Sequence, residues 1–181
     1  MILKPRIIGD ERGYFMETFR HDDFVAHVGN ISFVQDNESA SSYGVIRGLH
    51  FQRMPHAQSK LVRCVAGKVL DVAVDVREDS PTFGRHIAVE LDSAEGTMLF
   101  LPRGMAHGFA VLSDRAVFQY KCDAYYHPEA EGGIYPFDPA LGIDWRIDPA
   151  RAILSQKDLA RKPLSESLDQ LNFSGNLYGR F

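Results

Sequence analysis

The chain has 181 residues, of which 45% are hydrophobic and 24% charged, and its formal net charge is −4. This length and composition predict one globular domain, residues 1–181, rather than a disordered chain. The mildly acidic charge excludes the strong basic field that collects nucleic acid or anionic lipid. No apolar run reaches the roughly 18 residues that a membrane helix needs. We therefore expect neither nucleic acid nor a membrane as a partner.

The number and spacing of the cysteines indicate whether the protein works in a reducing or an oxidising compartment. Cys64 and Cys122 lie far apart in strand-like runs, and no C-x-x-C motif is present. This excludes a zinc knuckle and a disulfide framework, and it favours reduced, buried thiols. The first residues also lack the apolar run of a secretory signal. A cytoplasmic location is the expectation.

In chain order, the first predicted element is a short helix in residues 21–29, ended by Gly29. Residues 60–77, "KLVRCVAGKVLDVAVDVR", predict two strands joined by a turn at Gly67. In the second strand, small and acidic residues alternate with Leu and Val, so one face should meet a core and the other a wet cavity or surface.

Further strand-length runs cover residues 84–92, 96–104, 107–113 and 115–126, with turn residues between them. Residues 127–148 are rich in Gly and Pro and predict an ordered loop over the mouth of a barrel. Residues 155–164 predict a short helix capped by Ser155 and stopped by Pro163. Residues 165–181 form a C-terminal tail. Regular strand spacing predicts a mainly all-β fold, an antiparallel barrel or sandwich with short flanking helices.

The sharpest single motif is "GTMLFLPRGMAHGF", in which Gly96, Pro102, Gly104 and His107 fit the spacing G-x5-P-x-G-x2-H. It resembles the second conserved motif of the cupin superfamily, which implies a β-barrel of jelly-roll type. The H-x-H of the first cupin motif is absent. His50 and His107 alone do not make a convergent ligand set, so no metal is predicted there. His56, next to Pro55, is interpreted as a bystander.

A narrower resemblance extends from residue 1 to about 164. The blocks "GDERGYFMETF", "FVQDNESASSYGVIRGLHFQ", "AQSKLVRCVAGKVLDVAVDVR", "FLPRGMAHGFAVLSD", "YKCDAYYHPEAEGGI" and "LSQKD" occur in that order. Together they resemble the dTDP-4-dehydrorhamnose 3,5-epimerase family. The resemblance implies an isomerase of dTDP-rhamnose biosynthesis, which serves lipopolysaccharide and cell-wall polysaccharide. It also implies a homodimer whose neighbouring subunit completes each site.

The implied reaction inverts carbons 3 and 5 of dTDP-4-keto-6-deoxy-D-glucose, without metal or cofactor. Both carbons lie next to the ketone, so removing either proton gives an enolate. Such chemistry needs a base, a stabiliser of the enolate oxygen and an acid on the opposite face. His50 is the natural base because a neutral imidazole is available near neutral pH. The resemblance implies Asp158 as its orienting partner, Lys60 as the enolate stabiliser and Tyr120 as the acid.

The resemblance also implies a set of substrate-binding positions. Arginine suits a diphosphate because its guanidinium presents a fork of donors. His107 should line the same cavity, and Asp71 is a secondary candidate there. The implied binding residues are Arg12, Glu17, Gln35, Asn37, Arg47, His107, Tyr126 and Glu131.

Each of these residues also has a structural interpretation. His50 or His107 could be a core histidine, and Asp158 could be a first-turn acid of a helix. Lys60 could lie on an edge strand, and Tyr120 could pack in the core.

Other functions stay open on the sequence. They are an epimerase acting at one carbon only, a ketoisomerase on a related nucleotide sugar, a metal-dependent cupin oxygenase and a non-catalytic sugar-binding barrel.

Overall fold

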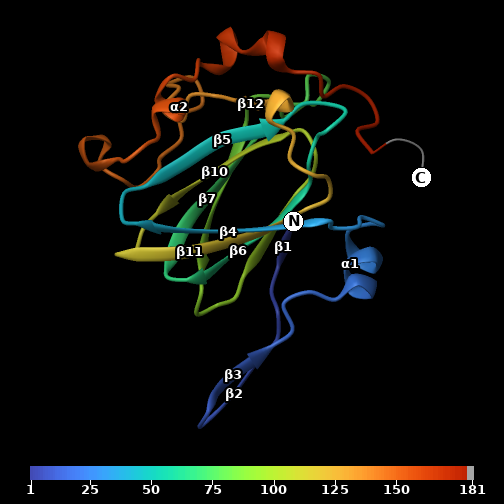
Figure 1. The fold of residues 1–181 in the computed structure, drawn as a ribbon, viewed down its shortest axis with the longest axis vertical. Coiled ribbons are helices and arrows are strands. Elements are labelled where there is room, and N and C mark those ends of the chain that lie inside the picture. The colour runs from blue at the N-terminus through green and yellow to red at the C-terminus, as the bar shows by residue number, and fades with distance from the viewer. Residues whose placement is uncertain (179–181) are drawn as a thin grey trace.

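The computed structural model describes residues 1–178, and two antiparallel sheets form its body (Figure 1). The strands are β1 (Ile2–Leu3), β2 (Ile7–Asp10), β3 (Gly13–Met16), β4 (Gln35–Ser42), β5 (Ile46–Gln52), β6 (Lys60–Ala66), β7 (Lys68–Asp75), β8 (His86–Asp92), β9 (Met98–Leu101), β10 (Met105–Val111), β11 (Arg115–Cys122) and β12 (Glu131–Gly133). The helices are α1 (His21–His27) and α2 (Gln156–Leu159), with 3-10 turns η1 (Pro128–Ala130), η2 (Pro149–Arg151), η3 (Leu164–Glu166) and η4 (Leu168–Gln170).

One sheet has the strand order β1-β9-β6-β11-β4, and the other has the order β12-β5-β10-β7-β8. Neighbouring strands in both sheets run antiparallel. The predicted all-β fold of jelly-roll type is confirmed. The predicted strands, the turn at Gly67 and both short helices are present, and only β10 begins outside its expected range, two residues early at Met105. None of the helices in the described part of the chain is long and apolar enough to cross a bilayer.

A first core fills the space between the sheets. Phe118 of β11 stacks on Phe109 of β10 with ring centroids 4.2 Å apart, and Val62, Leu99 and Leu91 pack in the same cluster. These side chains come from alternate positions of each strand, as the two-residue period of a strand requires. The first core therefore holds the sheets face to face. Cys64 and Cys122 are buried and free, as predicted.

A second core covers the outer face of β5, β10 and β7. Leu70, Val72 and Val74 of β7 pack there under Trp145 and Phe173 from the C-terminal third of the chain. The expectation that residues 127–148 form a loop over the barrel mouth is therefore wrong for its second half. The expected wet face of β7 is also wrong, because that strand is buried from its second residue to its last.

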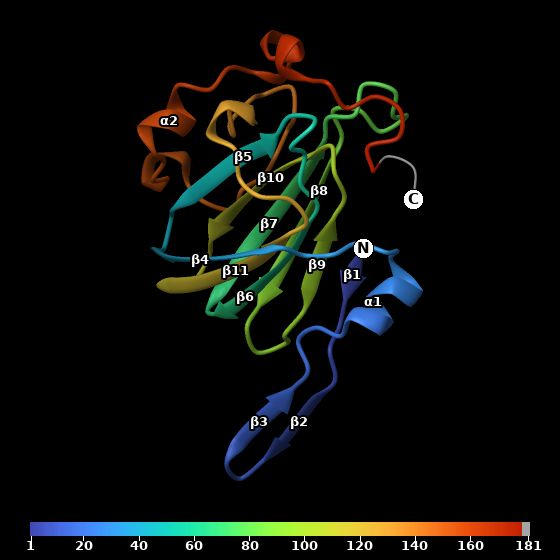
Figure 2. The same ribbon diagram turned by 45° about the vertical axis from the view of Figure 1, so that its right-hand side comes forward.

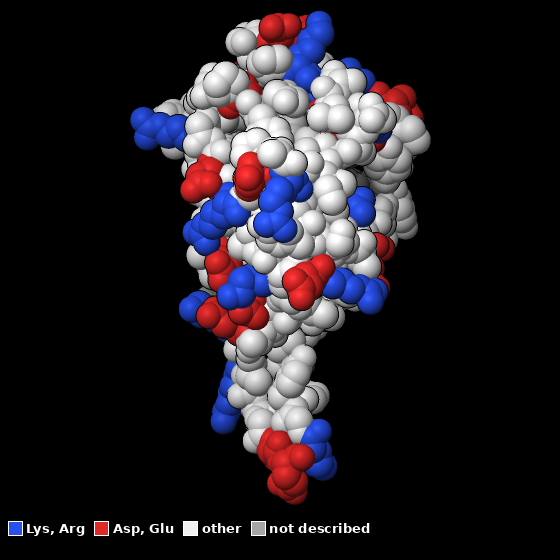
Figure 3. All heavy atoms as spheres, turned by 90° about the vertical axis from the view of Figure 1, so that its left-hand side faces the viewer, with Lys and Arg blue, Asp and Glu red and all other residues white. Residues whose placement is uncertain are grey.

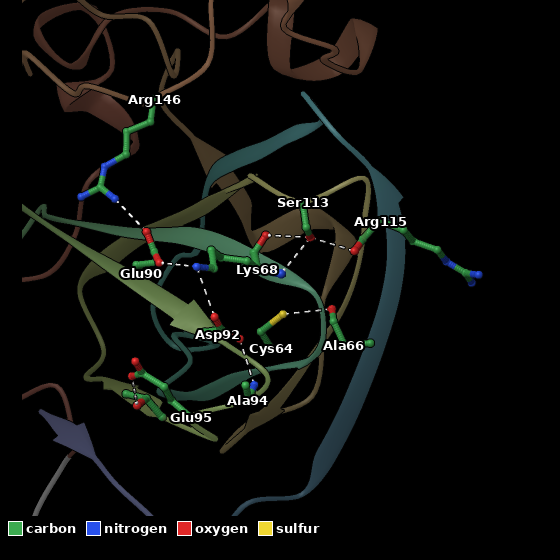
Figure 4. A network of polar contacts seen from close by, with 11 residues as sticks. Cys64, Ala66, Lys68, Glu90, Asp92, Ala94, Glu95, Ser113, Arg115 and Arg146 are labelled. Atoms are coloured by element: carbon green, nitrogen blue, oxygen red, sulfur yellow. Dashed lines mark hydrogen bonds and ion pairs between the residues drawn. The ribbon is translucent and has the colours of Figure 1, made fainter.

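Charged side chains tie the C-terminal segment to the edge of the second sheet. Lys68 of β7 pairs with Glu90 and Asp92 of β8, and Arg146 reaches Glu90 (Figure 4). These are exposed or half-exposed pairs, which contribute little stability each. On the face in Figure 3, acidic and basic side chains are interspersed rather than gathered by sign.

The two ends of the chain behave differently. Within the predicted tail 165–181, the described residues pack on the barrel, where Phe173 contacts Phe51 edge-on with centroids 5.4 Å apart. Residues 179–181 lie outside the described part. At the other end, the hairpin β2–β3 extends away from the body in both ribbon views (Figures 1 and 2). Its exposed Ile8, Tyr14 and Phe15 have no core to pack against.

Candidate active site

A cavity of about 700 Å³ opens between the two sheets. That volume suits a bound ligand of drug size or larger. The cavity gathers residues that are spread over the sequence from β4 to α2, and most of the predicted site residues are among them. Those lining residues are Gln35, Asn37, Arg47, His50, Lys60, His107, Tyr120, Tyr126, Glu131 and Asp158.

His50 and Asp158 form a hydrogen-bonded pair. His50 projects from β5 and its Nε2 lies 2.5 Å from Oδ1 of Asp158, which belongs to α2. Ser155 caps α2 by accepting a hydrogen bond from the Asp158 backbone, which fixes the start of the helix. Since Nε2 donates to the carboxylate, Nδ1 of His50 is the nitrogen left to accept a proton.

The electrostatics of Asp158 favour its ionised form. Burial raises the pKa of Asp158, but hydrogen bonds from His50, Ser155 and the Gly48 backbone outweigh burial, so the pKa lies below its ordinary value. An ionised Asp158 holds the His50 tautomer and stabilises the imidazolium that forms when His50 takes a proton.

Close backbone contact between β5 and β10 sets the position of His50. A Cβ on Gly48 would lie 2.5 Å from the Gly108 Cα, and Gly48 has a φ of 124°. Only glycine fits such an approach with a positive φ. The strand pairing places His50 directly opposite His107, and the register shifts just after this pair. The irregular pairing turns the Arg47 and His50 side chains toward the cavity.

Lys60 and Tyr120 approach the cavity from the other sheet. Lys60 begins β6, Tyr120 lies on β11, and the Lys60 ammonium is 5.6 Å from the centre of the Tyr120 ring. Burial lowers the pKa of Lys60 and raises the pKa of Tyr120. Because β5 belongs to the facing sheet, His50 and Tyr120 can reach a bound molecule from opposite sides.

His107 and Asp71 form a second pair at the floor of the cavity. Their side chains are joined by a hydrogen bond of 2.8 Å from Nε2 to Oδ2, and both are buried. Burial lowers the pKa of His107 and raises that of Asp71. The other oxygen of Asp71, Oδ1, has no hydrogen-bond partner among the described residues. Asp71 does not line the cavity itself, but it holds the His107 side chain, which does.

A polar network lines the remaining side of the cavity. Gln35 bonds to Asn37 and to the Tyr126 backbone, and the Tyr126 hydroxyl donates to Glu131 at 2.6 Å. Glu131 also accepts from Lys157 and Arg161, at 2.6 and 2.7 Å. Arg47 donates two hydrogen bonds to Ser41 and stays exposed. Amides, hydroxyls and cations of this kind suit a polar, anionic ligand.

Sequence reasoning missed several polar lining residues, among them Gln52 and Lys157. Gln52 is buried and its Nε2 donor has no partner among the described residues, so it is a free donor in the cavity. Lys157 is largely exposed and adds a cation beside Asp158. Lys157 precedes Asp158 in the block "LSQKD", and this neighbour could have predicted that Lys157 lines the same cavity. Gln52 follows "RGLHF" and carried no signal beyond its place in that block.

Two predicted residues lie outside the cavity of their own chain. Arg12, at the tip of the β2–β3 hairpin, is exposed and pairs with Asp10. Glu17, just beyond the hairpin, pairs with Arg20. The structure does not bring either residue to the cavity within one chain.

Comparison with known proteins identifies the family. The family model described as dTDP-4-dehydrorhamnose 3,5-epimerase matches residues 1–166. The chain belongs to this family. The enzyme of that name from Escherichia coli is 52% identical over 159 residues, which cover 87% of this chain and 85% of the relative. The family resemblance and the assignment as an epimerase are thus confirmed.

Solved structures agree with this assignment. The dTDP-6-deoxy-D-glucose-3,5-epimerase of Legionella pneumophila, solved with dTDP-4-keto-L-rhamnose, superposes with a TM-score of 0.91. The two proteins are 46% identical, and the match covers 97% of this chain and 93% of that one. A 3'-monoepimerase from Streptomyces bikiniensis, solved with dTDP-quinovose, gives a TM-score of 0.87 at 37% identity over 94% and 87% of the two chains.

Proposed function

We propose that this chain converts dTDP-4-keto-6-deoxy-D-glucose to dTDP-4-keto-L-rhamnose by inverting carbons 3 and 5. The observation that carries the proposal is a base and an acid on facing sheets of one cavity, with the ammonium of the half-buried Lys60 beside the acid. Similarity to the Escherichia coli and Legionella pneumophila enzymes supports the choice of substrate.

The proposed reaction begins at His50. Its Nδ1 takes a proton from a carbon next to the ketone, while Nε2 stays bonded to Asp158. The C–H electron pair moves into the carbonyl and gives an enolate, whose oxygen is stabilised by Lys60. Tyr120 then donates its hydroxyl proton to the opposite face of the same carbon. The centre is inverted, and proton exchange with water restores His50 and Tyr120.

The raised pKa of Tyr120 fits a group that stays protonated until the enolate forms. Burial costs the phenolate more than the phenol, so Tyr120 keeps its proton at neutral pH. An enolate carbon is far more basic than a ketone, so even a weak acid can protonate it when held in contact. The Lys60 ammonium close to the Tyr120 ring limits the cost of the phenolate left behind.

Nucleotide and diphosphate recognition is assigned to the polar side of the cavity. Arg47 and Lys157 supply positive charge for the diphosphate. Gln35, Asn37 and the Tyr126–Glu131 pair would bond the sugar and base. Glu131 holds Lys157 in place, so the cation is positioned before the ligand arrives.

A homodimer is part of the proposal. The β2–β3 hairpin exposes Ile8, Tyr14 and Phe15 and carries Arg12 at its tip. Arg12 does not line the cavity of its own chain. Exposed apolar side chains on an extended arm suit contact with a second copy. In the dimer, each hairpin would bring Arg12 to the diphosphate in the other subunit's cavity, with Glu17 at its base.

The second candidate is an epimerase acting at one carbon. The Streptomyces bikiniensis monoepimerase shares this fold at lower identity, so the fold serves that reaction in a relative. Exchange at carbon 3 alone would identify it here. We also place the reaction in the cytoplasm, in keeping with the two free, buried cysteines.

Proton NMR of the keto sugar in deuterium oxide tests the reaction. We expect solvent deuterium at carbons 3 and 5, with rates unchanged by a chelator. Deuterium at carbon 3 only would replace the double epimerase by the single one. Activity lost with chelator and restored by iron would support an oxygenase. Ligand binding without exchange would leave a non-catalytic sugar-binding barrel.

Subunit mixing tests the dimer. Arg12→Ala and His50→Ala should each be inactive alone. If Arg12 acts across the interface, refolding them together at equal concentration gives mixed dimers with one complete site. Random pairing then restores about a quarter of the wild-type activity. No recovery would place Arg12 outside the partner's site.

A further inference from the structure

Two loops meet beside the cavity and bring two histidines into contact. His56 lies between β5 and β6, and His127 lies between β11 and η1. Their imidazole rings stack with centroids 3.5 Å apart and an interplanar angle of 26°. Glu129 lies next to them, with its Oε1 3.1 Å from Nδ1 of His127. Each of these residues offers one ligand atom, and the three atoms lie within 4.8 Å of one another.

The chemistry of this cluster fits a metal ion. In the described part of the chain the ring nitrogens of His56 make no hydrogen bond, and the His127 ring bonds only to Glu129. The Arg53 guanidinium donates to the Glu129 backbone carbonyl and not to its carboxylate, which leaves the carboxylate for the cluster.

We propose that His56, His127 and Glu129 bind one Zn²⁺ or a similar borderline transition-metal ion. Two imidazole nitrogens and one carboxylate oxygen are ligands that zinc accepts. Mg²⁺ and Ca²⁺ prefer sites built from oxygen, so they are not expected here. Water would complete the coordination, because Glu129 is exposed and both histidines are half-buried.

The geometry requires a modest closure. Zinc ligands lie about 2.0–2.2 Å from the ion, so neighbouring donors of a tetrahedral site are about 3.3 Å apart. The ligand atoms must therefore draw together from their present spread of up to 4.8 Å. The two rings must also tilt out of their stack, because each ligating nitrogen has to point at the same ion. Side-chain rotation can supply both changes, since the Glu129 side chain is 70% exposed.

This site is distinct from the active site, although its neighbours reach the cavity. None of the three ligands lines the cavity, whereas Gln52, Tyr126 and Glu131 do. The backbone N–H of His127 donates to Gln52 Oε1 at 2.8 Å, and Arg53 N donates to Ala130 O at 2.8 Å. A metal would therefore fasten the loop after β5 to the segment before β12. It would stabilise one rim of the cavity without taking part in the reaction.

Zinc titration of chelator-stripped full-length protein, in competition with a chromophoric chelator, tests the proposal. We expect one equivalent of Zn²⁺ per chain and no competition from excess Mg²⁺. His56→Ala and His127→Ala should each weaken the affinity by at least about tenfold, since even the loss of a partner behind a ligand costs that much. His27→Ala is the matched control, because it removes an exposed histidine from α1.

Thermal unfolding supplies a second readout. Ligand that binds only the folded state raises the midpoint. Zinc should raise the midpoint of the wild type and of His27→Ala, and raise it less in the two cluster variants. Equal midpoints of all four proteins without zinc would show that the variants fold. Unchanged zinc affinity in His56→Ala or His127→Ala, or equal loss in His27→Ala, would overturn the site.

Discussion

Two histidine–aspartate pairs lie at the cavity, and they differ in their access to solvent. In the pair of β5 and α2, the His50 side chain is 34% exposed and that of Asp158 is 4% exposed. In the pair of β10 and β7, the exposed fractions of His107 and Asp71 are 6% and 0%. The two histidines are cross-strand neighbours, so the same sheet presents one pair to the cavity and buries the other.

The difference indicates separate roles. A histidine that exchanges protons with a substrate must be reached by it, and its carboxylate partner must stay ionised. His50 and Asp158 meet both conditions. For His107 and Asp71, burial favours the uncharged forms, and the hydrogen bond between them satisfies polar groups that would otherwise be costly inside the protein. We expect the first pair to control activity and the second to control stability.

The largest expected effect is the loss of the base. His50→Ala should lower deuterium exchange into the keto sugar by about 10²–10⁴-fold, the usual contribution of a positioned base. Asp158 keeps its hydrogen bonds from Ser155 and the Gly48 backbone, so the midpoint of urea unfolding should fall less than when the buried pair is broken. His27→Ala, on the surface of α1, is the matched control for exchange. If His50→Ala exchanges deuterium as fast as the wild type, His50 is not the base.

The buried pair should respond in the opposite way. His107→Ala leaves the buried Asp71 carboxyl without its hydrogen-bond partner, and leaving a buried polar group unsatisfied costs about 1–3 kcal/mol of unfolding free energy. Urea denaturation measures this loss. Adding Asp71→Ala to the same chain should recover part of it, because no unpartnered carboxyl then remains at this position. If His107→Ala is as stable as the wild type while His50→Ala is not, the two roles are reversed.

Asp158→Asn should have a smaller effect than removing the base. The Asn amide can donate to Nε2 of His50, which would place the ring proton on Nδ1, the atom that must accept a proton. We expect exchange to fall by about a hundredfold, near the lower limit for loss of base catalysis. Asp71→Asn should lower exchange less. Equal losses in the two variants would mean that both pairs act on the substrate.

Some of this arrangement was predictable from sequence. Strand periodicity predicted β6 to β11, and the helix signals around Ser155 predicted α2. The family blocks placed His50, Lys60 and Tyr120 together in one site. These features are local patterns or short blocks, which a single sequence displays well.

The rest depended on long-range packing that local patterns do not encode. The second face of β7 was expected to be wet, yet Asp71 finds His107 on another strand, 36 residues away. Residues 127–148 are rich in Gly and Pro and predicted an ordered loop over the barrel mouth, but Trp145 packs in a core that exists only once β5, β7 and β10 are assembled. His56, beside Pro55, carries no sign in the sequence of its contact with His127, because His127 lies on a different loop.

Acid titration of stability gives the smallest effect and separates the pairs by sign. The pKa of Asp158 is lowered, so its stabilisation is present above the unfolded value of about 3.9 and is lost as pH falls through the folded pKa. The pKa of Asp71 is raised by burial, so its ionised form is destabilising, and that penalty disappears as pH falls. Each unit of pKa difference corresponds to about 1.4 kcal/mol.

The measurement is the unfolding free energy from about pH 3 to pH 7 for the wild type, Asp158→Asn and Asp71→Asn. On acidification, the wild type should lose stability relative to Asp158→Asn, because only the wild type has that carboxylate to protonate. Relative to Asp71→Asn it should gain stability. Differences of the same sign would show that burial does not separate the two aspartates, and the division between a catalytic and a structural pair would then fail.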